Sequence, residues 1–430
     1  MSNNYTTATT CRCCGSDRLI PLFSLGEHYV NDFVSEHRLL TDYADCIKCP
    51  IDLDFCDGCG LVQARHAVDM DLLYRGNYWY TSGRTQTMRD ALKDVVRSAM
   101  RACPLSTGDV VLDIGSNDGT LLRNYPAEMV RVGVEPAKNL ATDENYEGLV
   151  LVKDLWNSGE YYRTLNRMNR TGTYCDHAKI VTACGMFYDL VDPNQFIADI
   201  AKVLHHDGVF VAQLMCLKQT MEQMDVGNFC HEHLEFYSLS SLHNLLRTHG
   251  LGIFNIEEND VNGGSYRLYC CHRESKGVAQ TNEMKGRCVD AFARENQLHL
   301  GEPKELISRY QDMLRNAQEL KAFLLKEKQR GARIFIMGAS TKGNTILQFC
   351  QIDYRIVEGA ADKDPAKWGR YMVGSDIPIM SLEAMRRLDP DYVLVLPYAF
   401  RAEMMELEKD QTWRKRGGRF VFPLPKLEVV

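Results

Sequence analysis

Short hydrophobic runs recur through the middle of this chain, and stretches with helical character accompany them. The runs lie at residues 110–113, 132–134, 150–152, 179–182 and 209–213, and helices are expected at 85–102 and 196–204. Strands that alternate with helices predict a mostly parallel sheet covered on both faces. The pattern therefore indicates an α/β fold with a Rossmann-like central domain.

A glycine-rich bend at 115–119 follows the first run, and helix-like sequence resumes at Thr120. In an open α/β sheet, ligands bind outside the carboxyl ends of the strands, and glycine lets the backbone approach them. The next strand ends at Glu135, whose carboxylate can accept both hydroxyls of a ribose. A dinucleotide site requires G-x-G-x-x-G, but the spacing here is Asp-x-Gly-x-x-x-Gly. This favours S-adenosylmethionine, which brings no pyrophosphate to the helix N-terminus, over an ordinary strand-to-helix turn.

The candidate cofactor-binding residues lie in this bend or at the ends of neighbouring strands. They are Asp113, Gly115, Asn117, Asp118, Gly119, Glu135 and Asp154. Asp154 follows the run at 150–152 and is a candidate acceptor for the adenine amino group.

Two C-x-x-C pairs near the N-terminus, each followed by glycine, predict a zinc site. The pairs are Cys11 with Cys14 and Cys56 with Cys59. Two such knuckles close a tetrahedral thiolate site, and the glycine admits the tight turn. Four protein ligands leave no open position, so the zinc is expected to be structural.

The cysteine pattern leaves alternatives open. Cys46 and Cys49 form a third pair without a trailing glycine, and Cys13 lies inside the first pair. Cysteines that serve redox chemistry or packing are the other possibility for this segment.

Polar and aromatic clusters mark the candidate acceptor side. Residues 72–83 are rich in aromatic and small residues, which suits a lid over a ligand or a packed linker between domains. His231, Glu232 and His233 form the densest polar cluster. A metal site is one interpretation, although H-E-x-x-H is absent. A base with a supporting carboxylate and a satisfied structural cluster are the others.

The last third of the chain repeats the strand, turn and helix pattern after a charged helical connector at 279–329. Lys342 lies in this pattern at residues 331–345 and could hold a phosphate with the turn amides. The turn matches neither a P-loop nor a dinucleotide fingerprint. With further runs at 392–397 and 419–423, it predicts a second, smaller α/β domain.

Length and charge bound the remaining possibilities. A chain of 430 residues suggests two or three domains. A net charge of −7 gives no indication of nucleic-acid or membrane binding. The N-terminus lacks an apolar signal core, and no apolar run could span a membrane. Sixteen cysteines without a secretory signal argue for reduced thiols. We therefore expect a cytoplasmic protein that binds no nucleic acid and no membrane.

These segments, in this order, resemble the C-methyltransferases that act on nucleotide-linked 4-keto-deoxyhexoses. Besides the paired C-x-x-C motifs, the resemblance rests on residues 59–63, 78–83, 113–121, 134–136, 231–234, 263–265 and 338–345. It implies a zinc-binding module at 1–73 and an S-adenosylmethionine-dependent domain at 74–275. A connector and a Rossmann-like domain would occupy 276–430, with the nucleotide sugar between the last two domains.

The resemblance also implies residue roles. His233 would remove the proton beside the ketone, Glu232 would fix the sugar or the imidazole, and Tyr78 would line the reacting centre. The resulting enolate would take the sulfonium methyl group. Further candidates for substrate binding are Tyr80, Cys230, His231, Asn262, Lys342 and Asn344.

The acceptor side departs from the family pattern at several positions. Cys230 stands where the family usually has tyrosine, Asp189 where it has histidine, and Asn262 where it has the histidine of His-Gly-Gly-Ser. Residues 213–215 replace a Glu-Val-Pro strand end. The alternatives are therefore methylation of an oxygen or nitrogen on the same scaffold, and a zinc-stabilised ligand-binding protein without catalysis.

Overall fold

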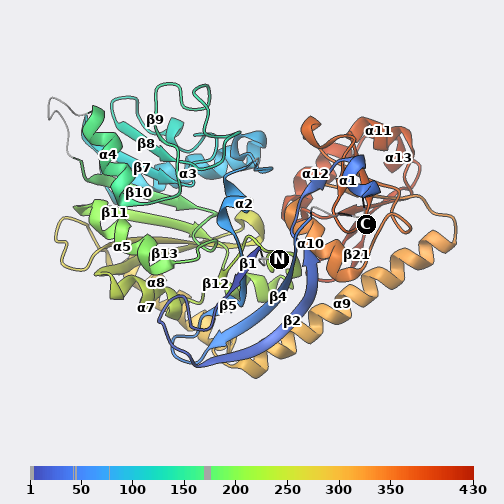
Figure 1. Cartoon of the computed structure of the whole chain (residues 1–430), viewed down its shortest axis with the longest axis horizontal. Helices are drawn as coiled ribbons and strands as arrows, with labels where there is room; N and C mark the ends of the chain where they lie inside the picture. Colours follow the sequence, from blue (N-terminus) through green and yellow to red (C-terminus); the bar gives the residue numbers. More distant parts are fainter. Residues whose placement is uncertain (1–3, 42, 44–45, 77, 169–175) are drawn as a thin grey trace.

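The computed structural model describes residues 4–41, 43, 46–76, 78–168 and 176–430. Residue 77, within the aromatic stretch, lies outside the described residues. The chain forms two α/β lobes joined by an N-terminal sheet and a long helix (Figure 1). None of the helices in the described ranges combines the length and the apolarity that crossing a membrane requires.

The central lobe is built on a seven-stranded sheet with the order β13-β14-β11-β10-β7-β8-β9. Strands β7 to β11 are parallel, whereas β14 and β13 are antiparallel additions at one edge. The expected α/β fold with a mostly parallel sheet is thus confirmed. The strands are β7 (Val110–Ile114), β8 (Val130–Val134), β9 (Val150–Val152), β10 (Ala178–Cys184), β11 (Leu204–Leu214), β13 (Leu251–Asn259) and β14 (Ser265–His272).

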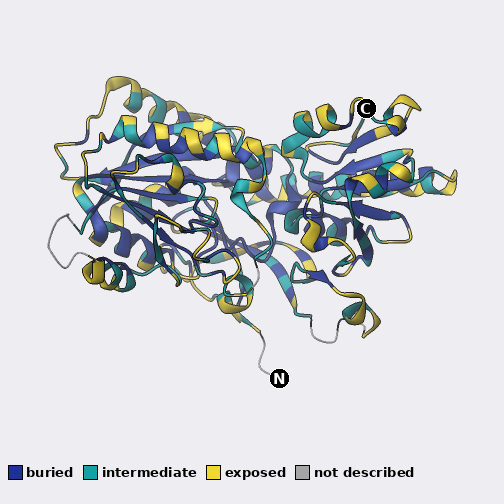
Figure 2. Ribbon diagram, turned by 90° about the horizontal axis from the view of Figure 1, so that it is seen from above, coloured by how far each residue is buried: buried dark blue, intermediate teal, exposed yellow. Residues whose placement is uncertain are grey.

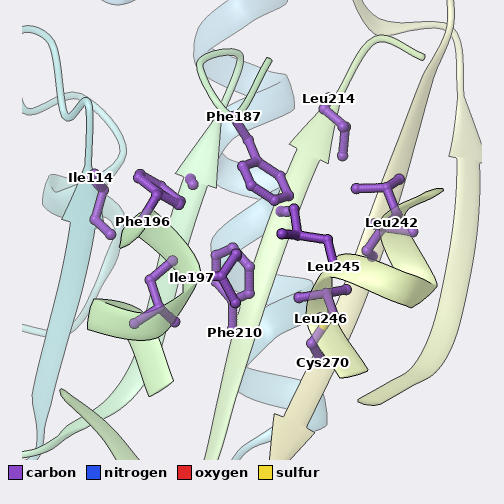
Figure 3. Close-up of a cluster of buried hydrophobic side chains, with 14 of the residues drawn as sticks. Ile114, Phe187, Phe196, Ile197, Phe210, Leu214, Leu242, Leu245, Leu246 and Cys270 are labelled. Carbon is purple, nitrogen blue, oxygen red and sulfur yellow. The ribbon is translucent and has the colours of Figure 1, made fainter. Parts of the chain in front are cut away.

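Helices cover both faces of this sheet, which explains why its strands read as continuous apolar runs. Phe210 of β11 faces Ile197 and Leu245, which come from α5 and α7 (Figure 3). Its neighbour Val211 points to the other face, where Val95 of α3 packs. The helices of this lobe are α3 (Gln86–Ala102), α4 (Ser158–Met168), α5 (Pro193–Val203), α6 (Leu217–Glu222), α7 (Leu239–Thr248) and α8 (Asn282–Gln297).

The helix expected from Thr120 is absent from the described structure, so this prediction was wrong. Only a short 3-10 helix forms, η2 (Leu122–Asn124), and Tyr125 is already extended with φ −77° and ψ 150°. Pro126 follows, and a residue before proline avoids helical backbone. The bend is therefore followed by a loop.

The C-terminal lobe contains an eight-stranded sheet with the order β21-β20-β19-β15-β16-β18-β17-β3. Its strands are β15 (Ile334–Met337), β16 (Gly359–Ala361), β17 (Tyr371–Met372), β18 (Ile377–Met380), β19 (Tyr392–Val395), β20 (Arg419–Phe422), β21 (Glu428–Val429) and the N-terminal β3 (Phe33–Val34). Its helices are α10 (Thr341–Cys350), α11 (Leu382–Arg387), α12 (Arg401–Glu408) and α13 (Thr412–Lys415). Viewed from above, both lobes have buried strands inside and exposed residues along their outer helices (Figure 2).

The N-terminal segment does not form a separate body, because it shares strands with both lobes. Its sheet has the order β12-β5-β4-β2, and β12 (Glu235–Phe236) comes from the central lobe. The other strands are β2 (Leu19–Tyr29), β4 (Lys48–Cys56) and β5 (Val62–Ala64), and β1 (Tyr5–Thr7) pairs with β6 (His66–Val68). Two short helices, α1 (Glu36–Leu40) and α2 (Met70–Tyr74), complete the segment.

The connector is two helices rather than one. α8 packs on β13 of the central sheet, and its Ala291 lies in the central core. α9 (Pro303–Gln329) packs instead against β2 and α10. The stacked rings of Phe23 and Tyr310, with centroids 4.2 Å apart, join β2 to α9. We therefore propose that the central domain continues through α8, beyond the expected boundary at residue 275.

Candidate functional site

Four thiols meet beside β4 and β5. The Sγ atoms of Cys11, Cys14, Cys56 and Cys59 all lie within 4.8 Å of one another. Cys11 and Cys59 are 3.5 Å apart, as are Cys14 and Cys56. Zn–S bonds of about 2.3 Å in a tetrahedron place sulfur atoms roughly 3.8 Å apart, so the group fits zinc.

The knuckle glycines have the backbone that the sequence predicted. Gly15 and Gly60 have φ of +71° and +76°, the left-handed region that glycine tolerates. Their N–H groups donate to the carbonyls of Cys11 and Cys56, each over 2.9 Å. Cys49 of the third pair is buried elsewhere, with its thiol directed to the carbonyl of Pro50.

A cavity of about 350 Å³ opens at the carboxyl ends of β7 and β8, and we name it the turn cavity. Its lining includes Gly115, Asn117, Glu135 and Asp154. Both oxygens of Glu135 accept backbone N–H groups, from Asn117 and from Ala137, each over 2.8 Å. These bonds hold the carboxylate at the cavity wall and leave lone pairs free to accept further hydrogen bonds. The predicted contact of Glu135 with the ribose hydroxyls of S-adenosylmethionine stays a prediction.

Asp113, Asp118 and Gly119 are not among the residues that line the turn cavity. Asp113 is buried and accepts a hydrogen bond from Thr182 over 2.6 Å. Asp118 accepts from the N–H of Gly83 over 2.9 Å. The Asp118 bond fastens the aromatic stretch to the bend, whereas the Asp113 bond joins β7 to β10, and the predicted cofactor contacts of Asp113, Asp118 and Gly119 stay predictions.

Asp154 lines the turn cavity and forms an ion pair with Arg75 over 2.8 Å. Its predicted role toward the adenine amino group stays a prediction. Arg75 directly follows α2, so the pair ties the N-terminal segment to the cavity.

Replacing Glu135 by alanine should weaken S-adenosylmethionine binding by about 1.5–3 kcal/mol, the range for hydrogen bonds to a charged group. Burial raises the pKa of Glu135 to about 7. Since hydroxyls donate best to the ionised carboxylate, affinity should fall as the pH drops below about 7. Titration calorimetry at pH 6 and pH 8 measures both effects.

The Glu135→Gln variant should lose this pH dependence. Burial also raises the pKa of Asp113 to about 7, but Asp113 is present in both proteins, so their difference isolates Glu135. Glu128→Ala changes an exposed acid of the same lobe and is the control. Unaltered affinity in Glu135→Ala would contradict the assignment.

Two further cavities adjoin the turn cavity. The histidine cavity, of about 230 Å³, is lined by His233, Asn262 and Lys342 among others. The arginine cavity, of about 570 Å³, is lined by Glu232, Asn31, Asp32, Arg38, Trp79, Thr341 and Arg370 among others. Tyr78 and Tyr80 line all three cavities. The aromatic stretch therefore stands where the three spaces meet, between the two lobes.

His233 lies in a turn that hydrogen bonds hold in place on both sides. Its Nδ1 is 2.8 Å from the carbonyl of Asn228. A carbonyl only accepts, so Nδ1 carries the hydrogen and Nε2 keeps a lone pair in the neutral ring. On the other side, Leu234 donates its N–H to the carbonyl of Tyr188, and the Tyr188 ring packs against His233 with centroids 4.5 Å apart.

Burial, with a smaller effect from the nearby ammonium of Lys342, lowers the pKa of His233 to about 3. The imidazole is therefore neutral at physiological pH and able to accept a proton. Lys342 itself is held by Asp225, with its ammonium 2.7 Å from a carboxylate oxygen.

Two buried acids face these cavities with an oxygen that lacks a partner. Glu232 is 8% exposed and Asp189 is 6% exposed. One oxygen of each makes no hydrogen bond within the described part of the chain. The sequence marked Asp189 only as a departure, although its place just after β10, at the carboxyl edge of the sheet, was the signal that could have assigned it to the site.

Three predicted substrate-binding residues line none of the three cavities as the described residues define them. His231 directs Nε2 to the carbonyl of Cys49 over 2.9 Å, away from the site. Asn344 is 0% exposed and donates to Asn31 and to the carbonyl of Val373. Cys230 is buried. Nδ1 of His231 and Oδ1 of Asn344 are buried without a hydrogen-bond partner among the described residues, but neither residue lines a cavity, so their contact with a substrate stays a prediction.

Three family models match successive parts of the chain. Residues 11–74 match a putative zinc binding domain, residues 84–255 a methyltransferase domain, and residues 260–425 a C-methyltransferase C-terminal domain. C-methyltransferase NovU from Streptomyces niveus is 27% identical over 431 residues, which cover 98% of this chain and 96% of NovU.

Solved methyltransferase structures are similar to part of the chain. A putative methyltransferase in complex with the Haloferax volcanii Trm112 activator is 15% identical, with a TM-score of 0.34 over 44% of this chain and 94% of the other. Magnesium protoporphyrin IX methyltransferase from Synechocystis PCC 6803 is 10% identical, with a TM-score of 0.31 over 42% and 78%. Likenesses this low carry no argument about function.

Proposed function

We propose that this chain, which belongs to the S-adenosylmethionine-dependent C-methyltransferases with an N-terminal zinc module, acts on a nucleotide-linked keto-deoxysugar. The observation that carries the proposal is that the three cavities meet at Tyr78 and Tyr80, and that His233 lies in the wall of the histidine cavity. When bound, S-adenosylmethionine supplies an electrophilic methyl group.

The histidine cavity suits the reacting part of the sugar. A ketone acidifies the neighbouring C–H bond, but ionisation still needs a base and a group that stabilises the oxyanion. Nε2 of His233 has the free lone pair that removes this proton. Burial keeps the imidazole unprotonated, although the lowered pKa also makes it a weaker base, and the carbonyl of Asn228 fixes its orientation.

The arginine cavity suits the nucleotide. Arg38 and Arg370 both line it, and guanidinium groups are suited to phosphate oxygens. Arg370 lies 5.1 Å from the ring of Trp79, and Arg38 is 3.0 Å from Asp32. Glu232 is in the wall of the same cavity and would reach the sugar hydroxyls through its unpartnered oxygen.

The test is incubation with labelled S-adenosylmethionine and a panel of dTDP-, GDP- and CDP-linked ketosugars. The expected product gains one methyl group by mass, and carbon–proton NMR places it on the carbon beside the ketone. A new methyl group on oxygen or nitrogen would contradict the proposal. Binding of S-adenosylmethionine without turnover of any ketosugar would also contradict it.

A further inference from the structure

We propose that the Asp189 carboxyl donates a hydrogen bond to the ketone oxygen of the acceptor and stabilises the enolate that forms there. This inference rests on the proposed function, since it assigns the oxyanion-stabilising group for that reaction.

Asp189 lies where two of the cavities meet. It follows β10 at the carboxyl edge of the central sheet, and its N–H bonds to the carbonyl of Met186 over 3.1 Å. It lines both the turn cavity and the histidine cavity, as Tyr78 does. Asp189 therefore lies at the boundary between the methyl donor and the acceptor, and it shares a cavity with His233.

One oxygen of the Asp189 carboxyl has no hydrogen-bond partner among the described residues. Oδ1 of Asp189 is buried and makes no hydrogen bond to any residue that the structure describes. Buried polar groups in folded proteins nearly always have a partner, so an orphan at a cavity wall indicates an atom that a ligand satisfies. A neutral carboxyl offers an O–H donor here, which suits an oxygen that gains negative charge.

Among the described residues, no cationic side chain contributes to the surroundings of the Asp189 carboxyl. The titratable groups that face it are acids, phenols and a thiol. They are Tyr74, Tyr78, Tyr188, Cys230, Glu232, Glu235 and Tyr237. The nearby cations are engaged elsewhere, since Arg12 faces Glu235 over 3.8 Å and Lys342 faces Asp225.

Burial, reinforced by the carboxyls of Glu232 and Glu235, raises the pKa of Asp189 well above its usual range, against a smaller lowering effect of a hydrogen bond from the Tyr74 hydroxyl. These surroundings favour the protonated form of the Asp189 carboxyl. An ionised carboxylate at this place would repel an enolate, whereas a protonated carboxyl binds it.

The reaction balances with these two residues. The C–H proton moves to Nε2 of His233, and the C–H electron pair forms the enolate, whose oxygen accepts the hydrogen bond from Asp189. Asp189 keeps its proton throughout. When the new C–C bond forms and the sulfur–methyl bond breaks, the ketone is restored and His233 releases its proton to solvent.

The test compares Asp189→Asn with Asp189→Ala in the full-length protein. Asparagine is nearly isosteric, donates a hydrogen bond and cannot ionise, so it should keep turnover within about tenfold of wild type. Alanine should lose about 10²–10³-fold, as for the loss of one oxyanion donor. Both variants should bind S-adenosylmethionine within about twofold of wild type by calorimetry, which also reports folding.

The pH profile gives a second readout that a structural role would not move. Wild-type kcat/KM should fall on the alkaline side as Asp189 ionises, and Asp189→Asn should lack this fall. Hydrogen–deuterium exchange beside the ketone, measured without methyl donor, should be slowed in Asp189→Ala and retained in Asp189→Asn.

Other outcomes would overturn the inference. An asparagine variant as inactive as alanine, with cofactor binding intact, would show that the ionised carboxylate is needed. A loss confined to ketosugars with an amino group would identify Asp189 as a cation-binding residue. If the wild-type protein methylates no ketosugar, the proposed function fails and the role of Asp189 falls with it.

Discussion

Replacing Cys56 by serine should release the zinc and lower the thermal stability of the whole chain. Structural zinc contributes about 10–16 kcal/mol of apparent folding free energy in small zinc modules. A whole domain is stable by only about 5–15 kcal/mol. Zinc content by metal analysis and unfolding by circular dichroism are the measurements, and wild type should hold one zinc per chain.

The effect should extend beyond the zinc site, because the knuckle supports the turn that carries His233. Arg12, between two of the ligands, faces the buried carboxyl of Glu235 over 3.8 Å. Glu235 in turn pairs with Gln63 across the strands β12 and β5. Loss of the knuckle should therefore reduce turnover as well as stability.

Cys49→Ser is the matched control for this prediction. Cys49 is also buried and also belongs to a C-x-x-C pair, but its thiol lies outside the cluster of four. This variant should keep its zinc. A Cys56→Ser protein with one zinc per chain and unchanged stability would contradict the zinc assignment.

The second large effect is expected from His233→Gln, which should lower turnover by about 10²–10⁴-fold, the usual cost of losing a general base. Glutamine keeps a hydrogen-bonding group near the carbonyl of Asn228 but has no basic nitrogen. Cofactor binding should remain, whereas hydrogen–deuterium exchange beside the ketone should be lost in heavy water without methyl donor. Mass spectrometry of the recovered sugar measures that exchange.

His231→Gln is the control for the second prediction. His231 is two residues away and equally buried, but its Nε2 faces the carbonyl of Cys49 and it lines none of the three cavities. It should retain most of the turnover. Full turnover in His233→Gln would place the base elsewhere.

The lowered pKa of His233 predicts how turnover depends on pH if His233 is the base. Because that pKa is lowered to about 3, the basic form persists below the ordinary histidine range near 6.5. His233 should therefore add no fall in kcat/KM near pH 6.5.

The sequence by itself determined the features that depend on residues close together in the chain. The two C-x-x-C-Gly knuckles define their own turns, and their spacing identified the four thiols that come together. The apolar run, the bend at 115–119 and the acid at Glu135 likewise follow from local strand and turn chemistry. These features predicted the zinc site, the cofactor and the α/β class.

The tertiary structure decided which side chains face a common space. His231 and His233 are two residues apart, yet only His233 lines one of the three cavities. The pairing of β12 with β5 and the hydrogen bond between His233 Nδ1 and the carbonyl of Asn228 set this orientation. Asp189 became a candidate catalytic group because β10 ends beside that cavity and because no cation packs against it in the described structure. Such pairings depend on contacts between distant segments, and local sequence does not encode which buried atom is left without a partner.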